Sequence, residues 1–184
     1  MTKVFDPRRL DVKSFAEEAG QLAGQDRLGT HDRLMVETAA RGADLPLDWS
    51  ATGELRNPGH LHPEIWLRLE ARAVLPLTCQ RCLGPVDIAV EVARPFRFVA
   101  DEDVAMAQDD ASEEDLLALS RSFDLVELVE DELLMDLPVA PRHDVCPALA
   151  KLAVAVADKD FEATAAEREN PFALLQRLKT RKAE

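Results

Sequence analysis

Residues 64–79 read EIWLRLEARAVLPLTC, and the charged side chains of this stretch stand only at even positions while every odd position is apolar. An alternation of period two is typical of a β-strand that buries one face and exposes the other. Pro76, at an even position near the end of the run, indicates an edge or a bulge there. The stretch therefore predicts one long, half-buried strand that ends at Cys79.

The next run of the chain shows the same alternation with the opposite parity. Residues 86–98, VDIAVEVARPFRF, place their large apolar side chains at even positions and most of their charged ones at odd positions. Residues 80–85, QRCLGP, join the two runs and contain the Gly-Pro signal of a turn. The two runs predict a long antiparallel hairpin with Cys79 and Cys82 at its tip.

The N-terminal part of the chain carries weaker signals. Asp6-Pro7 has the residue types of a helix N-cap and first position, and Gly20 is a plausible helix stop, so a short helix is predicted between them. Residues 33–40 and 47–56 have the apolar content of two further strands.

A second helix is predicted from Asp124 to Pro138. Asp124 can cap its first turn, an apolar stripe follows at helical spacing, and the proline ends it. The consecutive acidic residues 130–132 on this helix are interpreted as a solvated face, because neighbours along a helix point in different directions. The predicted fold is α+β: an antiparallel sheet with a long central hairpin, covered by a helix, plus short terminal helices.

The net charge of −13 is concentrated in one segment. Residues 101–132 hold thirteen acidic and one basic side chain, a net of −12, which leaves a net of −1 for the rest. Residues 101–122 combine this charge with little apolar periodicity and are predicted to form an acidic mobile loop. The alternative is an intramolecular mimic of a nucleic acid.

The predicted organisation has three parts. These are an N-terminal helical segment (1–32), an α+β core domain (33–146) and a C-terminal linker with a short helix that starts at Asn170 (147–184). The start of the chain lacks the pattern of a secretory signal, and no apolar run is long enough to cross a membrane. With an odd number of cysteines, these features favour a protein of the reducing cytoplasm without membrane contact.

Two pairs of potential metal ligands stand far apart in the sequence, Cys79-x-x-Cys82 and His143-x-x-Cys146. Zinc is commonly held by two such knuckles, because each pair supplies adjacent corners of a tetrahedron. The alternative is structural: Cys79 as a small core residue and His143 as an exposed loop residue. Dithiol redox chemistry is disfavoured, since reactive Cys-x-x-Cys motifs stand at helix N-termini rather than at hairpin tips.

The sequence contains no motif of a nucleophile elbow, a phosphate-binding loop, a dinucleotide fold or a zinc protease. Seven glycines are few for building phosphate-cradling loops. We therefore expect no enzymatic activity.

Arginines recur along the predicted hairpin. Arginine suits phosphate recognition through its planar fork of donors. Those considered as RNA contacts are Arg68, Arg72, Arg81 and Arg97. The alternative is an ordinary solvated sheet face, because acidic residues are interleaved with them.

The order of motifs resembles the YceD family, the bacterial large ribosomal RNA subunit accumulation proteins. The resemblance rests on TCQRCL at 78–83, on DLVELVEDELLMDLPVAPRHDVC at 124–146 and on NPFALLQRLK at 170–179. Several relatives carry further Cys-x-x-Cys pairs where this chain has only His143 and Cys146. The implied site is therefore either a Cys3His version or the remnant of a lost one.

The resemblance implies a ribosome biogenesis factor that promotes synthesis, processing or stability of 23S ribosomal RNA. The implied partner is 23S rRNA or a precursor of the large subunit, and no catalysis is implied. The alternative function is that of an adaptor that binds a protein partner without direct RNA contact.

Overall fold

The long hairpin forms with the predicted parity. In the computed structural model, which describes residues 4–61 and 63–147, β3 (Glu64–Thr78) pairs antiparallel with β4 (Pro85–Val99). The register places Leu77 opposite Val86 and Ile65 opposite Phe98, so the odd positions of β3 share a face with the even positions of β4. Both strands bury this face, which confirms that the alternation of apolar and polar residues separates a buried face from an exposed one.

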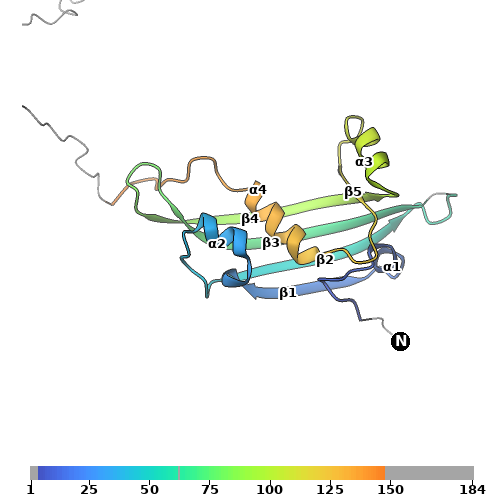
Figure 1. Ribbon diagram of the computed structural model, residues 1–184, viewed down its shortest axis with the longest axis horizontal. Coiled ribbons are helices and arrows are strands. Elements are labelled where there is room, and N and C mark those ends of the chain that lie inside the picture. The colour runs from blue at the N-terminus through green and yellow to red at the C-terminus, as the bar shows by residue number, and fades with distance from the viewer. Residues whose placement is uncertain (1–3, 62, 148–184) are drawn as a thin grey trace, which may run out of the picture. The chain divides into compact units, whose positions relative to one another are not determined.

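The hairpin is the centre of a five-stranded sheet in the order β1-β2-β3-β4-β5 (Figure 1). On one side β2 (Pro46–Arg56) pairs antiparallel with β3, and β1 (Gln21–Arg27) pairs antiparallel with β2. On the other side β5 (Asp115–Ala118) is parallel to β4. The predicted α+β class is confirmed, with one parallel pair in an otherwise antiparallel sheet.

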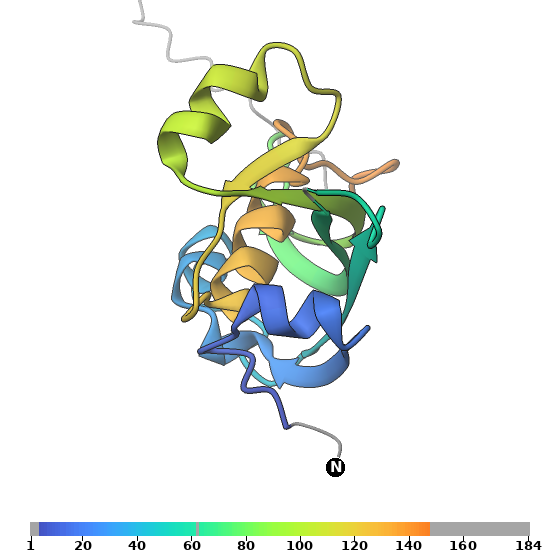
Figure 2. The same ribbon diagram turned by 90° about the vertical axis from the view of Figure 1, so that its right-hand side faces the viewer.

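Helices share the apolar core with the sheet. α1 (Val12–Glu17) contacts β2 and β3, whereas α4 (Leu125–Met135) contacts β3 and β4. The end view places α4 on one side of the sheet (Figure 2). Phe15 of α1 lies so close to Gly53 that any added Cβ there would meet its ring at 2.8 Å. This glycine is therefore required for the close approach of α1 to the sheet.

α4 begins where the sequence predicted, because the Asp124 carboxylate accepts hydrogen bonds from the backbone N–H groups of Val126 and Glu127, both at 3.0 Å. The expected solvated acidic face is wrong for two of its three residues. Glu130 and Glu132 are buried, and each has an arginine partner from another element. Helix periodicity could not reveal these partners, since both lie far away in the sequence.

The N-terminal segment contains more than a helix. Its helix is capped by Asp11, which accepts from the Ser14 N–H, and not by Asp6, which stands in a preceding turn. The segment 1–32 also contributes β1, which the sequence analysis missed. Because β1 is an edge strand and none of its residues is buried, its sequence QLAGQDR carries no clear alternation.

The strand predicted at 33–40 is wrong. Residues 33–37 belong to α2 (Asp32–Glu37), which follows a short 3₁₀ turn, η1 (Leu28–Thr30), and residues 38–40 form a turn. No side chain at the N-cap position of α2 caps the helix. The Glu130 carboxylate does so instead, accepting from the N–H groups of Arg33 at 2.8 Å and Leu34 at 3.1 Å. A helix N-terminus capped from another helix leaves no local signal in the sequence.

The acidic segment 101–122 is not the structureless loop that its composition predicted. It forms α3 (Glu102–Asp109), capped by the Asp101 carboxylate, and then β5. β5 pairs its backbone with the edge of β4, and Arg97 of β4 donates to Gln108 and Ser112. Backbone pairing with an existing sheet edge orders a segment that has little apolar surface of its own.

The chain divides into two units, Met1–Pro147 and Ala148–Glu184. The helix predicted from Asn170 lies outside the described residues. Within residues 4–61 and 63–147, no helix has the length and apolar character needed to cross a membrane.

Candidate metal centre and nucleic-acid interface

The first pair of cysteines stands where the hairpin turns. β3 ends at Thr78, and the turn closes through hydrogen bonds from the Cys79 N–H to the Gly84 carbonyl and from the Leu83 N–H to the Cys79 carbonyl, both at 2.9 Å. Leu83 has a φ of 59°, in the left-handed region. This curled backbone brings Cys82 back toward Cys79.

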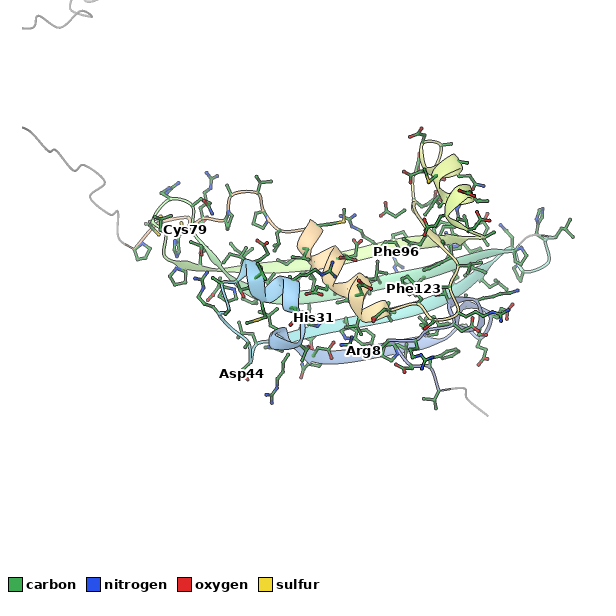
Figure 3. The ribbon with its side chains drawn as sticks, viewed as in Figure 1. Arg8, His31, Asp44, Cys79, Phe96 and Phe123 are labelled. Carbon is green, nitrogen blue, oxygen red and sulfur yellow. The ribbon has the colours of Figure 1, made fainter. Side chains whose placement is uncertain are left out.

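The second knuckle reaches the same place after α4. Residues 138–141, PVAP, cannot continue the helix and carry the chain along the sheet toward the hairpin tip. There the Gln80 N–H donates to the Pro141 carbonyl at 2.8 Å and joins the two segments. Figure 3 shows Cys79 at the end of the hairpin, away from α1 and β5.

The four predicted ligands converge, as expected from the two pairs. The Cys79 and Cys146 sulfurs are 3.9 Å apart, and the Cys82 sulfur is 3.5 Å from His143 Nδ1. All four ligand atoms of Cys79, Cys82, His143 and Cys146 lie within 4.8 Å of one another. In a tetrahedral zinc site with bonds of about 2.0–2.3 Å, neighbouring ligand atoms are roughly 3.5–3.8 Å apart. The chemistry and the spacing of this set therefore fit a closed structural zinc site.

The electrostatics around the sulfurs also suit a metal. Burial raises the pKa of the Cys79 thiol, but the backbone N–H groups of Cys82, His143 and Arg81 donate to its sulfur and lower that pKa to about 5. Burial and the neighbouring sulfurs raise the pKa of Cys146. All three cysteines are free. The lowered pKa favours the thiolate form of Cys79 at neutral pH, and the thiolate is the form that binds a metal.

The four predicted RNA contacts are not brought together. Arg68 and Arg72 lie exposed on the face of β3 opposite the helices, and Arg72 donates to Asp48 at 3.1 Å. Arg97 donates hydrogen bonds to Gln108 and Ser112 of the acidic segment. Arg81 is exposed at the hairpin tip, beside the cysteines.

One exposed arginine at the tip was missed by the sequence analysis. Arg142 precedes His143 in the second knuckle and is exposed, as Arg81 is in the first. The sequence did contain a signal for this residue, because in each knuckle an arginine directly precedes a candidate ligand. Each knuckle of the cluster thus carries one exposed guanidinium.

The fold and the cluster define an α+β protein with a Cys3His centre at the tip of its central hairpin. Residues 67–179, more than half of the chain, match the family described as large ribosomal RNA subunit accumulation protein YceD, and the chain belongs to that family. The match includes most of the hairpin, all of α4 and both knuckles. Membership connects the chain with ribosome biogenesis. No solved structure matches the chain.

Proposed function

We propose that this protein promotes the accumulation of 23S rRNA by binding the rRNA, or a precursor of the large subunit, directly through the tip of its central hairpin. The observation that carries the proposal is the pair of exposed arginines, Arg81 and Arg142, one on each knuckle of the cluster. Guanidinium groups bind phosphate through two parallel hydrogen bonds. The Cys3His cluster that carries both arginines would fix the spacing of the two groups.

Zinc is the proposed resident metal, held by Cys79, Cys82, His143 and Cys146. Four protein ligands leave no open coordination position, so the metal would supply structure and no catalysis. The four ligand residues would hold the two knuckles at a fixed separation. The hydrogen bond from the Gln80 N–H to the Pro141 carbonyl is a second link between them. The sequence contains no motif of a nucleophile elbow or a phosphate-binding loop, and we propose that the protein has no catalytic turnover.

The test is RNA binding by the double variant Arg81→Ala/Arg142→Ala. Its matched control is Arg9→Ala/Arg27→Ala, which removes two exposed arginines far from the tip in sequence. If both tip arginines bind phosphate, the slope of log affinity against log salt falls by about 0.7–0.9 for each phosphate that the variant no longer neutralises. The control variant keeps the slope of the parent protein. The tip variant should also fail to restore the 23S to 16S ratio in cells that lack the protein.

Equal RNA affinity of parent and tip variant would refute RNA binding at the tip. An unchanged 23S to 16S ratio in a clean deletion would refute the role in rRNA accumulation itself.

A further inference from the structure

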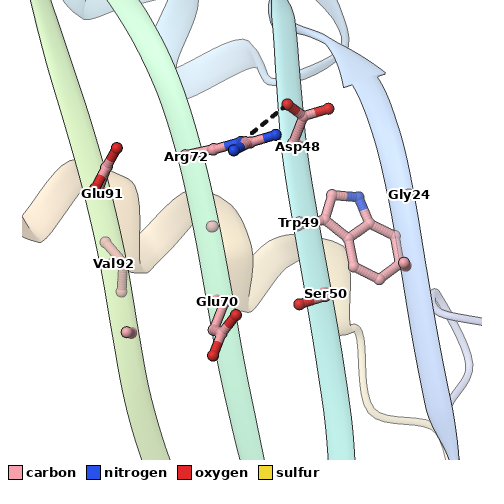
Figure 4. A pocket seen from close by; sticks show the side chains of 11 residues that line it. Gly24, Asp48, Trp49, Ser50, Glu70, Arg72, Glu91 and Val92 are labelled. Carbon is pink, nitrogen blue, oxygen red and sulfur yellow. Dashed lines mark hydrogen bonds and ion pairs between the residues drawn. The ribbon is translucent and has the colours of Figure 1, made fainter.

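The face of the sheet opposite α4 contains a hollow that follows from the strand register. Ala23, Ser50, Glu70 and Ala93 are consecutive partners across β1, β2, β3 and β4, so they form one row across four strands. Three of the four side chains are small. The row therefore lies low, and a hollow of about 610 Å³ opens above it (Figure 4).

A row of charged side chains borders this hollow. Asp48, Arg72 and Glu91 are partners across β2, β3 and β4, one step along the strands from the small row. A second hollow of about 160 Å³ lies beyond them and is lined by the same three residues. Residues on the same face of adjacent rows are roughly 7 Å apart.

The charge of the hollow is negative. Arg72 is neutralised by Asp48 at 3.1 Å, and a hydrogen bond from Gln25 and the contact with Arg72 lower the pKa of Asp48, which keeps it ionised. Within the described part of the chain, the side chains of Glu70 and Glu91 make no ion pair or hydrogen bond. Three carboxylates and one guanidinium leave a net charge of −2 in the hollow. Arg68 in the next row reduces this charge only to −1.

We infer that this hollow, named here the sheet hollow, binds an extended lysine- or arginine-bearing segment of a partner protein. The alanine and serine floor lets a backbone approach closely, while Glu70 and Glu91 offer carboxylates to cationic side chains. A phosphate backbone is repelled by the same carboxylates. A second copy of this chain would oppose an identical negative face, which disfavours a symmetric pair. Proteins that neutralise rRNA carry cationic segments, and such proteins are the expected class of partner.

The binding probe is a short oligolysine peptide, followed by isothermal titration and by amide shifts in two-dimensional NMR. The test variant is Glu70→Gln/Glu91→Gln, and its matched control is Glu102→Gln/Asp103→Asn in α3, which removes the same charge from another exposed site. All four side chains are exposed, so both variants keep the fold. We expect the test variant to bind about tenfold more weakly and the control less than twofold more weakly. The largest shifts are expected at Ala23, Ser50, Glu70 and Ala93.

Equal weakening in both variants would overturn the inference, because the peptide would then respond only to net charge. Shifts confined to other residues would overturn it as well. A third outcome concerns RNA. If an RNA oligonucleotide shifts the same four amides and binds more tightly to the test variant, the ligand of the sheet hollow is RNA and not a cationic segment. Loss of RNA binding in the tip variant Arg81→Ala/Arg142→Ala leaves this result unaffected, so the two proposals fail separately.

Discussion

The centre and the tip of the central hairpin are stabilised by different interactions. At the centre, Leu67, Leu69 and Phe96 are buried in the core shared with α1 and α4. At the tip, Cys79 is fully buried, but the large apolar side chains around it, Leu83 and Val145, are 73% and 85% exposed. Burial of apolar surface therefore accounts for the scaffold, whereas the tip depends on its four ligand side chains and a few backbone hydrogen bonds.

This difference separates stability from function. A sheet that folds by burial tolerates changes at its tip, and the exposed tip is free to present charged groups to a partner. This separation can be tested at the centre of the hairpin, at helix contacts and at the tip.

The largest effect is expected from Phe96→Ala. The ring is 2% exposed, and its removal leaves a cavity between the sheet and α4, which lowers the free energy of unfolding by about 3–5 kcal/mol. Urea denaturation measures the loss. The control Val74→Ala, at a side chain 46% exposed on the open face, should cost less than about 1 kcal/mol. Similar losses in both variants would show that the core does not dominate stability.

The next effect is expected from Glu130→Ala in α4. This change leaves the N–H groups of Arg33 and Leu34 at the start of α2 without their acceptor, at a cost of about 2 kcal/mol. The control is Asp131→Ala, which removes only an exposed contact with Arg33 and should cost less than about 0.5 kcal/mol. Thermal unfolding compares the two variants, and equal costs would contradict the capping role of Glu130.

A local effect is expected when the proposed zinc is removed from the protein by a chelator. The amides of Gln80 and Leu83, which are hydrogen-bonded within and between the knuckles, should exchange at least about tenfold faster. The amides of Leu67 and Leu69 in the centre should keep their protection. Metal analysis should find one zinc per chain before chelation and none in Cys82→Ser. Protein purified without zinc, or a sheet that unfolds on chelation, would contradict this view of the tip.

The smallest effect concerns Glu132. Burial raises its pKa, the Arg94 guanidinium opposes this, and the carboxylates of Asp115, Asp131 and Asp136 add to it. A group whose pKa is higher in the folded state contributes most below its unfolded value of about 4.3, and this contribution is lost as the pH rises through the folded pKa. Glu132→Gln should therefore gain stability relative to the parent as the pH rises from about 4 to 7. Parallel stability curves for the two proteins would contradict the raised pKa.

The candidate site was predicted more completely than the helices around the sheet. Two ligand pairs in the sequence were enough to predict the convergence of Cys79, Cys82, His143 and Cys146, because the hairpin and the proline-terminated helix before His143 had both been predicted. The sequence was less informative about which arginines are available as RNA contacts. Sequence alone could not show that Arg97 is engaged by Gln108 and Ser112, since these residues belong to a segment predicted to lack structure.

Two features were determined by the sequence alone: the opposite parities of the two hairpin strands and the Asp124 cap of α4. Both depend on side chains within a few residues of one another, where periodicity and capping chemistry operate. Only the tertiary structure decided that residues 32–37 are helical, that β5 joins the sheet and that Glu130 is buried. The acceptor for the start of α2 lies 97 residues away, and the partner of β5 is the edge of another strand. Backbone groups satisfied by such distant partners leave no local pattern in the chain.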